Sequence, residues 1–412
     1  MKPTNDSQPL PLSGIKVIDY THFLAGPHLS RCLAALGADV IKIERPTAGE
    51  AGRHHPYFKD GQSGYFLQQN MGKRGLCVNV KDSRGHALVC KLAETADVFV
   101  ENYRARALAK LGLGYDNLSA VNPGLVYCSI SGYGQNGPES HKAGFGLLAE
   151  ARSGVIAQLG NPGETPPLPR MPLADMYTGM HGVAAICAAL FGRVSSGRGQ
   201  HIDLALYDCM VSMHDFAVQA YTLSDGEKIP VQTGSDQPDS TVYGVFPASD
   251  GHLVIAAQVD TSWKRLARLI GGAELEVDTR FLDPGSRNAN RPAAINLVTE
   301  WTRSQPSREA CIAALDEAGV PCGPVQTIDE VVADPQIAAR GMIIEQDHPV
   351  LGRIKLPDLP FRFSGYDTSP GCPAPLLGQH NREIAAEAGF SQDEIDAMTR
   401  DGVLYSEEAV EA

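Results

Sequence analysis

The pattern of hydrophobic and polar positions at the start of the chain predicts one complete β-α-β unit. Residues 15–20 form an apolar run rich in β-branched side chains, which is typical of a buried strand. Leucines then recur at helical spacing in residues 28–36, after Pro27 and before Gly37, a residue that favours helix ends. A second apolar run, residues 39–44, predicts a second strand. Such units build parallel sheets, which bind ligands at the carboxyl ends of their strands.

Alternating strand and helix patterns continue to about residue 220, so the expected fold class is α/β with a Rossmann-like parallel sheet. The pattern changes near residue 225, and residues 241–325 have the mixed pattern of a smaller α+β domain. The sequence therefore predicts a large domain in residues 1–224, a small domain in residues 225–328 and a C-terminal segment in residues 329–412.

The charge balance and the apolar runs limit the kinds of partner that we expect. The chain carries 35 Lys and Arg residues against 48 Asp and Glu residues, and its formal net charge of −13 disfavours nucleic acid and anionic membranes. The longest apolar run, residues 183–191, is too short to span a bilayer. We therefore expect neither a nucleic-acid nor a membrane partner.

The cysteines and the first residues predict a cytoplasmic protein. The nine cysteines include no C-x-x-C pair and no zinc spacing, so reduced thiols are expected and no metal site is predicted. The first eleven residues are polar and lack the apolar core of a signal peptide.

Asp175 stands just before a mostly apolar stretch that predicts a helix over residues 178–194. One interpretation is a helix N-cap, because Asp is favoured there and the helix dipole stabilises its charge. The other is a carboxylate nucleophile or base that the start of the helix aims at a site. The residues alone leave both interpretations open.

The turn after the first strand, residues 21–27, lacks the G-x-G-x-x-G pattern that seats the pyrophosphate of NAD or FAD. In that turn His22 is either a loop histidine or a catalytic group, and Asn102 and Tyr103 either cap a later strand or contact an adenine. Basic residues recur at the ends of predicted strands and loops: Arg45, Lys73, Arg74, Arg104, Arg106, Lys110 and Lys142. Such cations are either solvated surface charges or ligands of a phosphate-rich molecule such as coenzyme A (CoA).

Nine motifs follow one another between about residues 10 and 390: DYTHFLAGP, LGADVIKIERP, NMGKRGLCVNVK, ADVFVENYRARALAKLGLGYD, SISGYGQNGP, PLADMYTG, GRGQHIDLALYD, GVPCGPV and PLLGQH. In this order they resemble the class III CoA-transferase family, which also includes the α-methylacyl-CoA racemases. Because the resemblance uses many separate motifs, it is more specific than any one of them.

The resemblance implies an interlocked-ring homodimer, in which each chain threads through its partner, and a C-terminal segment that returns to the large domain. It also implies that Asp175 is catalytic and carries CoA through an aspartyl anhydride and an aspartyl-CoA thioester. CoA and acyl-CoA are then substrates, with a small carboxylic acid as the second substrate, and no permanently bound cofactor is expected. The positions that match CoA-binding positions of the family are His22, Phe23, Ala25, Arg45, Lys73, Arg74, Asn102, Tyr103, Lys110 and Lys142.

Two departures from the family patterns bear on the reaction. Racemase members have a histidine where this chain has Phe145, which cannot move a proton, so the transferase branch is favoured. Leu24 stands where members that use oxalate have Gln, and their polyglycine loop is absent, so oxalate is not the first choice of acceptor. The alternatives are an α-methylacyl-CoA racemase and a non-catalytic acyl-CoA-binding subunit.

The expected donor is succinyl-CoA and the expected acceptor is a short dicarboxylic acid, because the motifs resemble the succinyl-CoA-dependent branch more than the oxalate branch. Arg53, Arg152 and Arg170 are candidates for the distal carboxylate of that acid, since a guanidinium matches a carboxylate in shape. The other interpretation of each arginine is a surface ion pair.

Overall fold

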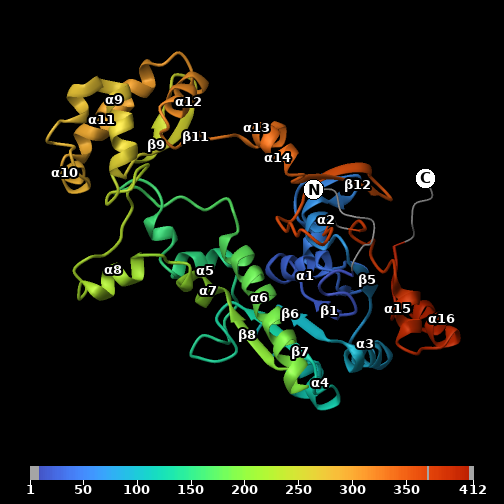
Figure 1. Cartoon of the computed structure of the whole chain (residues 1–412). Coiled ribbons are helices and arrows are strands. Elements are labelled where there is room, and N and C mark those ends of the chain that lie inside the picture. The colour runs from blue at the N-terminus through green and yellow to red at the C-terminus, as the bar shows by residue number, and fades with distance from the viewer. Residues whose placement is uncertain (1–8, 369–370, 408–412) are drawn as a thin grey trace. The chain divides into compact units, whose positions relative to one another are not determined.

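The computed structural model describes residues 9–368 and 371–407 of the chain (Figure 1). Its contacts divide the chain into two compact units, and each is made of segments that are distant in sequence. The large unit contains Met1–Gly154, Pro169–Asp215 and Pro335–Ala412, and the small unit contains Val155–Leu168 and Phe216–Asp334. The domain limits expected from the sequence remain a prediction of how the chain divides.

The large unit is built on a six-stranded sheet in which every neighbouring pair of strands is parallel. The order across the sheet is β5 (Arg74–Cys77), β2 (Asp39–Glu44), β1 (Lys16–Tyr20), β6 (Val98–Glu101), β7 (Val126–Ser131) and β8 (His201–Ala205). Numbered by their place in the chain, the strands follow the order 3-2-1-4-5-6 of a Rossmann fold. The α/β class and the parallel sheet predicted from the sequence are therefore confirmed.

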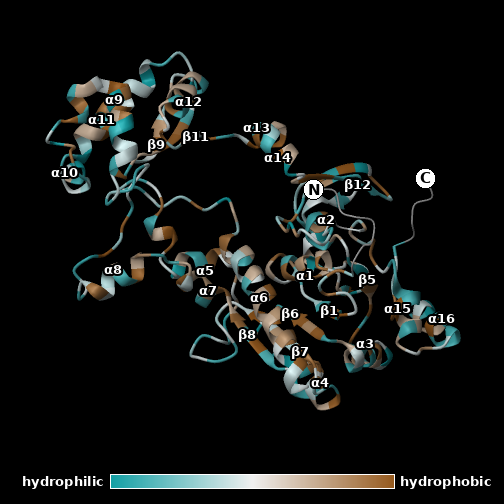
Figure 2. Ribbon diagram, in the orientation of Figure 1, coloured by the Kyte–Doolittle hydropathy of each residue, from teal (hydrophilic) through white to brown (hydrophobic). Residues whose placement is uncertain are grey.

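The inner strands β6 and β7 are rich in apolar and β-branched residues, and they are buried on both faces of the sheet. Figure 2 shows hydrophobic residues along β6 and β7. The helices of this unit before the C-terminal segment are α1 (Ala25–Ala35), α2 (Gly64–Asn70), α3 (Ser83–Thr95), α4 (Tyr115–Val121), α5 (Gly146–Arg152), α6 (Leu173–Ser196) and α7 (Leu206–Ser212). A short hairpin, β3 (Phe58–Lys59) and β4 (Gln62–Ser63), precedes α2.

Helices α1 and α6 approach each other closely because two glycines of α6 face α1. A Cβ at Gly182 would overlap the Leu29 side chain, and a Cβ at Gly179 would lie 2.9 Å from the Ala25 carbonyl oxygen. This approach brings the first turn of α6 toward the start of α1. By length and composition alone, α6 is the one helix among the described residues that could cross a membrane, a test that the core helix of a soluble protein also passes.

The C-terminal segment packs on the edge strand β5. It contains α14 (Pro335–Ala339), the hairpin β12 (Ile343–His348) and β13 (Gly352–Pro357), α15 (Asn381–Glu387) and α16 (Gln392–Arg400). The Gly75 N–H donates to Nδ1 of His380, and the Cys77 N–H donates to Oδ1 of Asn381.

The small unit has its own core around a three-stranded antiparallel sheet, β11 (Cys322–Pro324), β10 (His252–Ala256) and β9 (Tyr243–Pro247). Its helices are α8 (Ala217–Leu223), α9 (Asp260–Glu276), α10 (Pro284–Ala289), α11 (Arg291–Ser304), α12 (Arg308–Glu317) and α13 (Ile328–Ala333). Trp263 and Phe281 pack together in this core. The α+β character predicted for residues 241–325 agrees with these elements.

Candidate active site

The order of the strands reverses between β1 and β6, and ligands of Rossmann-like sheets bind at the carboxyl ends of the strands there. The amide of Asn102, just after β6, joins the two strand ends. Its Oδ1 accepts a hydrogen bond from the His22 N–H at 2.8 Å, and its Nδ2 donates to the His22 carbonyl at 2.7 Å. The Tyr103 and His22 rings lie 4.7 Å apart. Four of the predicted CoA positions therefore lie where the strand order reverses and this fold binds ligands, a place that we call the switch point. These switch-point residues are His22, Phe23, Asn102 and Tyr103.

The turn between β1 and α1, residues 21–24, is held in an unusual conformation at Phe23. This residue has a φ of 63°, and its N–H donates to Oε2 of Glu50 at 2.9 Å. Glu50 is buried, and its second oxygen has no hydrogen-bond partner among the described residues. The Phe23 ring lies 6.2 Å from the Phe145 ring, so the turn contacts the segment that leads into α5.

His22 itself is a neutral group at physiological pH. Burial, followed by the charges of Lys42 and Arg45, lowers its pKa to about 4. A neutral imidazole donates or accepts hydrogen bonds but brings no positive charge to a phosphate. Ala25 opens α1 beside this turn and is buried.

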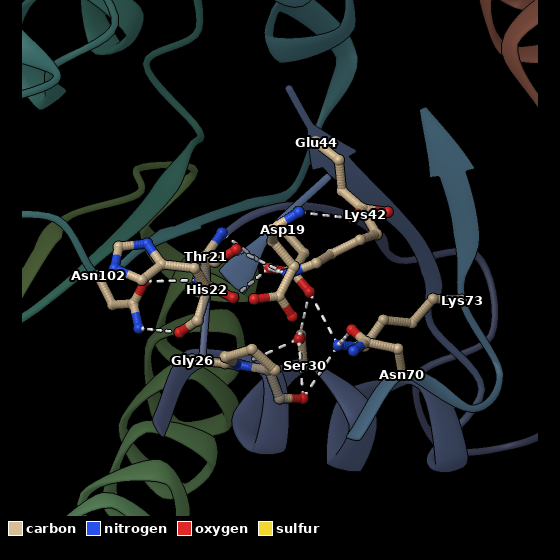
Figure 3. A network of polar contacts seen from close by, with 12 residues as sticks. Asp19, Thr21, His22, Gly26, Ser30, Lys42, Glu44, Asn70, Lys73 and Asn102 are labelled. Atoms are coloured by element: carbon tan, nitrogen blue, oxygen red, sulfur yellow. Dashed lines mark hydrogen bonds and ion pairs between the residues drawn. The ribbon is translucent and has the colours of Figure 1, made fainter. Parts of the chain in front are cut away.

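Behind the turn lies a buried polar network that we call the Asp19 cluster, made of Asp19, Thr21, Ser30, Lys42, Asn70 and Lys73 (Figure 3). Two lysines form ion pairs with the Asp19 carboxylate, Lys73 at 2.9 Å and Lys42 at 3.6 Å. The Thr21 and Ser30 hydroxyls donate hydrogen bonds to the same carboxylate. Burial alone would raise the pKa of Asp19, but the two lysines and two hydroxyls hold it far below its usual range. Because Lys42 also donates to the Thr21 carbonyl at 2.7 Å, the cluster fixes the start of the turn.

Lys73 has no free N–H for a ligand in this structure. Its ammonium donates to Asp19, to the Pro27 carbonyl at 3.0 Å and to the Asn70 amide oxygen at 2.7 Å, which uses all three donors. Burial lowers its pKa to about 8 in spite of the Asp19 charge. Lys73 supports the β1–α1 turn from inside, so its placement does not favour the CoA contact that the sequence predicts.

Arg74 is the first residue of β5, although the sequence suggested that the basic residues follow strands. Its guanidinium binds Asp39, the first residue of β2, and also Glu383 and Glu387 of α15. This places the guanidinium at the end of the sheet where β2 begins, away from the carboxyl ends of the strands. A CoA contact by Arg74 is not favoured by this geometry.

The remaining predicted cations are exposed. Arg45 directly follows β2 and donates through Nε to the Gly49 carbonyl at 2.9 Å. It is close enough to His22 and Tyr103 for its charge to affect the pKa of both. Lys110 is exposed after β6, and Lys142 is half exposed and paired with Glu139 at 2.7 Å. Arg45 thus lies near the switch-point residues, whereas Lys110 and Lys142 lie on the surface.

Asp175 lies inside the first turn of α6, because the helix begins earlier than the sequence predicts. Pro172 is the N-cap residue, and its side chain makes no capping hydrogen bond to the helix. The Ala174 N–H is bound instead by Oε1 of Glu150 from α5, at 3.0 Å. The capping interpretation of Asp175 was therefore wrong, and its carboxylate makes no hydrogen bond or ion pair with any residue that the structure describes.

The surroundings of Asp175 favour its protonated form. Burial, followed by the negative charge of Glu150, raises its pKa to about 6. A Cβ at Gly146 would overlap Oδ2 of Asp175 and lie 3.1 Å from its Cγ, so only glycine leaves room for this carboxylate. Because Phe145 precedes Gly146 and contacts Phe23, the carboxylate lies near the switch point.

The three candidate arginines have different surroundings. Arg53 binds Glu44 through two hydrogen bonds of 2.7 and 2.8 Å and lies over the Phe66 ring. Arg152 pairs with Glu139 and lies over the Tyr133 and Tyr207 rings. The exposed Arg170 has no ion pair or side-chain hydrogen bond within the described part of the chain.

Sequence reasoning missed Lys42, Glu50 and Glu150. A lysine inside an otherwise apolar strand is a usable signal, because a buried charge needs a partner, and Asp19 occupies the matching position of the neighbouring strand. Glu50 and Glu150 lie in loop-like and helical sequence, where an acidic residue is ordinary. No group of three or more His, Cys, Asp or Glu side chains in residues 9–368 and 371–407 could hold a metal.

Comparisons with known proteins agree with this fold. The family model described as CoA-transferase family III matches residues 12–381. Succinyl-CoA:glutarate CoA-transferase of Mus musculus is 34% identical over 99% of this chain and 93% of its own length. Succinyl-CoA:mesaconate CoA-transferase of Haloarcula marismortui is 36% identical over 92% of this chain and 96% of its own length. A CAIB/BAIF family protein from Brucella suis superimposes with a TM-score of 0.83, at 37% identity over 92% of this chain and all of the other. The chain belongs to CoA-transferase family III.

Proposed function

We propose that this protein is a CoA-transferase that moves CoA from succinyl-CoA to a dicarboxylic acid, with the Asp175 carboxylate as nucleophile. The observation that carries the proposal is the state of that carboxylate. It is partly buried, it has no hydrogen-bond partner among the described residues, and its pKa is raised to about 6. A carboxylate with this pKa is ionised at pH 7 and is more basic than an ordinary aspartate.

The first half of the reaction charges the enzyme with CoA. An oxygen of Asp175 attacks the thioester carbonyl of the donor, the C–S bond breaks, and CoA leaves as a thiolate. The thiolate then attacks Cγ of the mixed anhydride, which releases the donor acid and leaves an aspartyl-CoA thioester. A carboxylate suits this step because the anhydride keeps the acyl group activated.

The second half repeats these steps in reverse order. The carboxylate of the acceptor attacks Cγ, the thiolate leaves, and the thiolate then attacks the acceptor's carbonyl in the new anhydride. The products are an acyl-CoA and the free Asp175 carboxylate. Because water would hydrolyse both intermediates, the partial burial of Asp175 also helps the reaction.

CoA is proposed to bind at the switch point of the large-unit sheet. His22, Phe23, Ala25, Asn102 and Tyr103 line the strand ends there, and Arg45 supplies the positive charge for a phosphate. Lys110 and Lys142 remain proposed contacts for more distant parts of the cofactor.

The identity of the acids is proposed from the relatives. Two of them are named for transfer from succinyl-CoA to glutarate or mesaconate. Among the three candidate arginines, Arg170 is the one whose guanidinium is open to bind a second carboxylate. We therefore propose Arg170, five residues before Asp175, as the group that distinguishes dicarboxylic from monocarboxylic acids.

A racemase is the second candidate, and the position of Phe145 argues against it. Racemisation needs a base on each face of the Cα carbon. Gly146 adjoins Asp175, and Phe145, the residue before it, stands where racemases have a histidine; neither can move a proton. The free carboxylate of Asp175 likewise argues against a non-catalytic binding subunit.

We further propose the interlocked homodimer and a cytoplasmic location. Several large apolar side chains of α6 are exposed in the single chain, with Phe191 83% and Val194 87% exposed. A second copy of the chain would cover such residues. Light scattering on the purified protein tests the dimer, and a monomeric mass would contradict it.

The central experiment looks for the covalent intermediate. The protein is incubated with succinyl-CoA, treated with hydroxylamine or borohydride, digested and analysed by mass spectrometry. We expect modification of the Asp175 peptide in the wild type and none in the Asp175→Asn variant. An unmodified Asp175 in protein that still binds CoA would contradict the transferase and revive the other two candidates, for which proton exchange in deuterium oxide is the next assay.

A further inference from the structure

Glu150 is a buried carboxylate that the proposed mechanism does not use. It lies on α5, is 2% exposed, and accepts the Ala174 N–H at 3.0 Å. That N–H belongs to the first turn of α6, where the N-cap residue Pro172 provides no side-chain cap. Glu150 therefore caps a helix to which it does not belong, one residue before the proposed nucleophile.

One face of α5 is shaped around the first turn of α6. Gly146 and Glu150 are four residues apart and share that face. Gly146 leaves space for the Asp175 carboxylate, and Glu150 binds the backbone beside it. Space and a backbone anchor together determine where the carboxylate can point.

The charges around Asp175 are few and negative. From α5 it faces Glu150, and from α2 it faces Tyr65, whose pKa is raised by burial and by the charges of Asp175 and Glu50. Within the described residues, Asp175 forms no ion pair with a cation. A neighbouring anion disfavours ionised Asp175, whereas the anhydride and the thioester carry no charge at that position. Repulsion by Glu150 therefore disappears when Asp175 becomes acylated.

We propose that Glu150 is a positioning residue of the transferase, which anchors the first turn of α6 through the Ala174 N–H and drives Asp175 toward its uncharged acyl forms. This inference rests on the proposed function for its consequence in catalysis. The effect of the Glu150 charge on the protonation of Asp175 does not depend on the proposed function.

The decisive variant is Glu150→Gln, which keeps a carbonyl oxygen for the Ala174 N–H but removes the charge. We expect the acid limb of kcat/KM, measured with succinyl-CoA, to move to lower pH by roughly one unit. We also expect acylation of Asp175 at pH 8 to slow by about tenfold, because the nucleophile is less basic. Glu150→Ala removes the anchor as well and should lose more activity. Glu94→Gln on α3, which removes an exposed charge from the same unit, is the matched control and should match the wild type.

A second readout does not depend on turnover. Water-soluble carbodiimide modifies protonated carboxyl groups, so the pH dependence of Asp175 modification, followed by peptide mapping, reports its protonation directly. In Glu150→Gln this curve should also move to lower pH. If the curve and the acid limb both coincide with those of the wild type, the inference is overturned while the transferase stands. If the curve moves but the wild type shows no transfer, the electrostatic role stands and the proposed function fails.

Discussion

Two aspartates of the large unit, the buried Asp19 and the partly buried Asp175, have opposite surroundings. Asp19 is bound by two lysines and two hydroxyls, and its pKa lies far below the usual range. Asp175 has a carboxylate as its charged neighbour and no hydrogen-bond partner among the described residues, and its pKa is about 6. Burial acts in the same direction at both positions, so the partners decide the difference.

The difference separates support from reactivity. A carboxylate that buried lysines and hydroxyls already engage cannot attack a substrate, but it holds the β1–α1 turn through Lys42 and Lys73. A carboxylate without partners costs stability but is free to form a bond. The residue types at the two positions are identical, and the neighbouring elements assign their roles.

The largest expected effect is on catalysis, from Asp175→Asn. We expect transfer to fall by at least about a thousandfold, because the amide cannot form the anhydride. CoA binding should remain, since the switch-point residues are untouched. Steady-state kinetics and calorimetric titration with CoA measure the two properties. Loss of both together would mean that Asp175 holds the site rather than reacts in it.

The corresponding change at Asp19 should act on stability instead. Asp19→Asn leaves Lys42 and Lys73 buried without a counter-charge, and breaking such a pair costs about 3–5 kcal/mol. Urea unfolding of the variant measures this loss. Asp82→Asn on the surface, which also removes one charge, is the control and should change stability by much less. A stability equal to that of the wild type would contradict the supporting role of Asp19.

Gly146 tests how the space around Asp175 is reserved. In Gly146→Ala the new methyl group would overlap Oδ2 of Asp175 and turn the carboxylate away from its substrate. We expect about a hundredfold loss of transfer, because small displacements of reacting groups are costly. The melting temperature should change little, since the carboxylate can rotate. Gly192→Ala on α6 has open space around it and should keep full activity.

The pH dependence of stability should differ in sign for the two aspartates. Asp175 has a folded pKa of about 6 against an ordinary value of 3.8, so the folded protein binds more protons between these values. Its stability therefore falls as pH rises through that window, whereas Asp175→Asn lacks this loss. We expect the variant to gain on the wild type by about 2 kcal/mol between pH 4 and pH 6, and by only about 0.4 kcal/mol more above pH 6. A constant difference across this range would contradict the raised pKa.

Local patterns were enough to predict most of the fold. Residues 15–20 and 39–44 were predicted as strands and agree with β1 and β2 to within one residue. β5 was missed because it is short and begins with Arg74. Its place in the sheet depends on His380 and Asn381, which are about three hundred residues away in sequence and invisible to a local pattern.

The candidate site was predictable where it follows the backbone and not where it depends on distant partners. The switch-point residues directly follow predicted strands, and the family resemblance implies that they bind CoA; the strand order that brings them together is seen only in the structure. The capping interpretation of Asp175 failed because Glu150, far earlier in the chain, takes the backbone N–H. Lys73 was predicted as a ligand of CoA because nothing in its local sequence indicates that Asp19 and Asn70 already bind it.

The contrast between engaged and free groups extends to the arginines, and Arg170 provides the smallest effect. Arg53 and Arg152 are paired with acids, whereas Arg170 has no partner within the described residues. In Arg170→Gln we expect KM for a dicarboxylic acceptor to rise about tenfold, the size of one charge-assisted contact, with KM for a monocarboxylic acid unchanged. Because the succinyl group also has a free carboxylate, KM for succinyl-CoA should rise more than KM for acetyl-CoA. Arg198→Gln, a change at another exposed arginine, controls for the lost charge. Equal changes for both classes of acid would show that Arg170 does not bind the distal carboxylate.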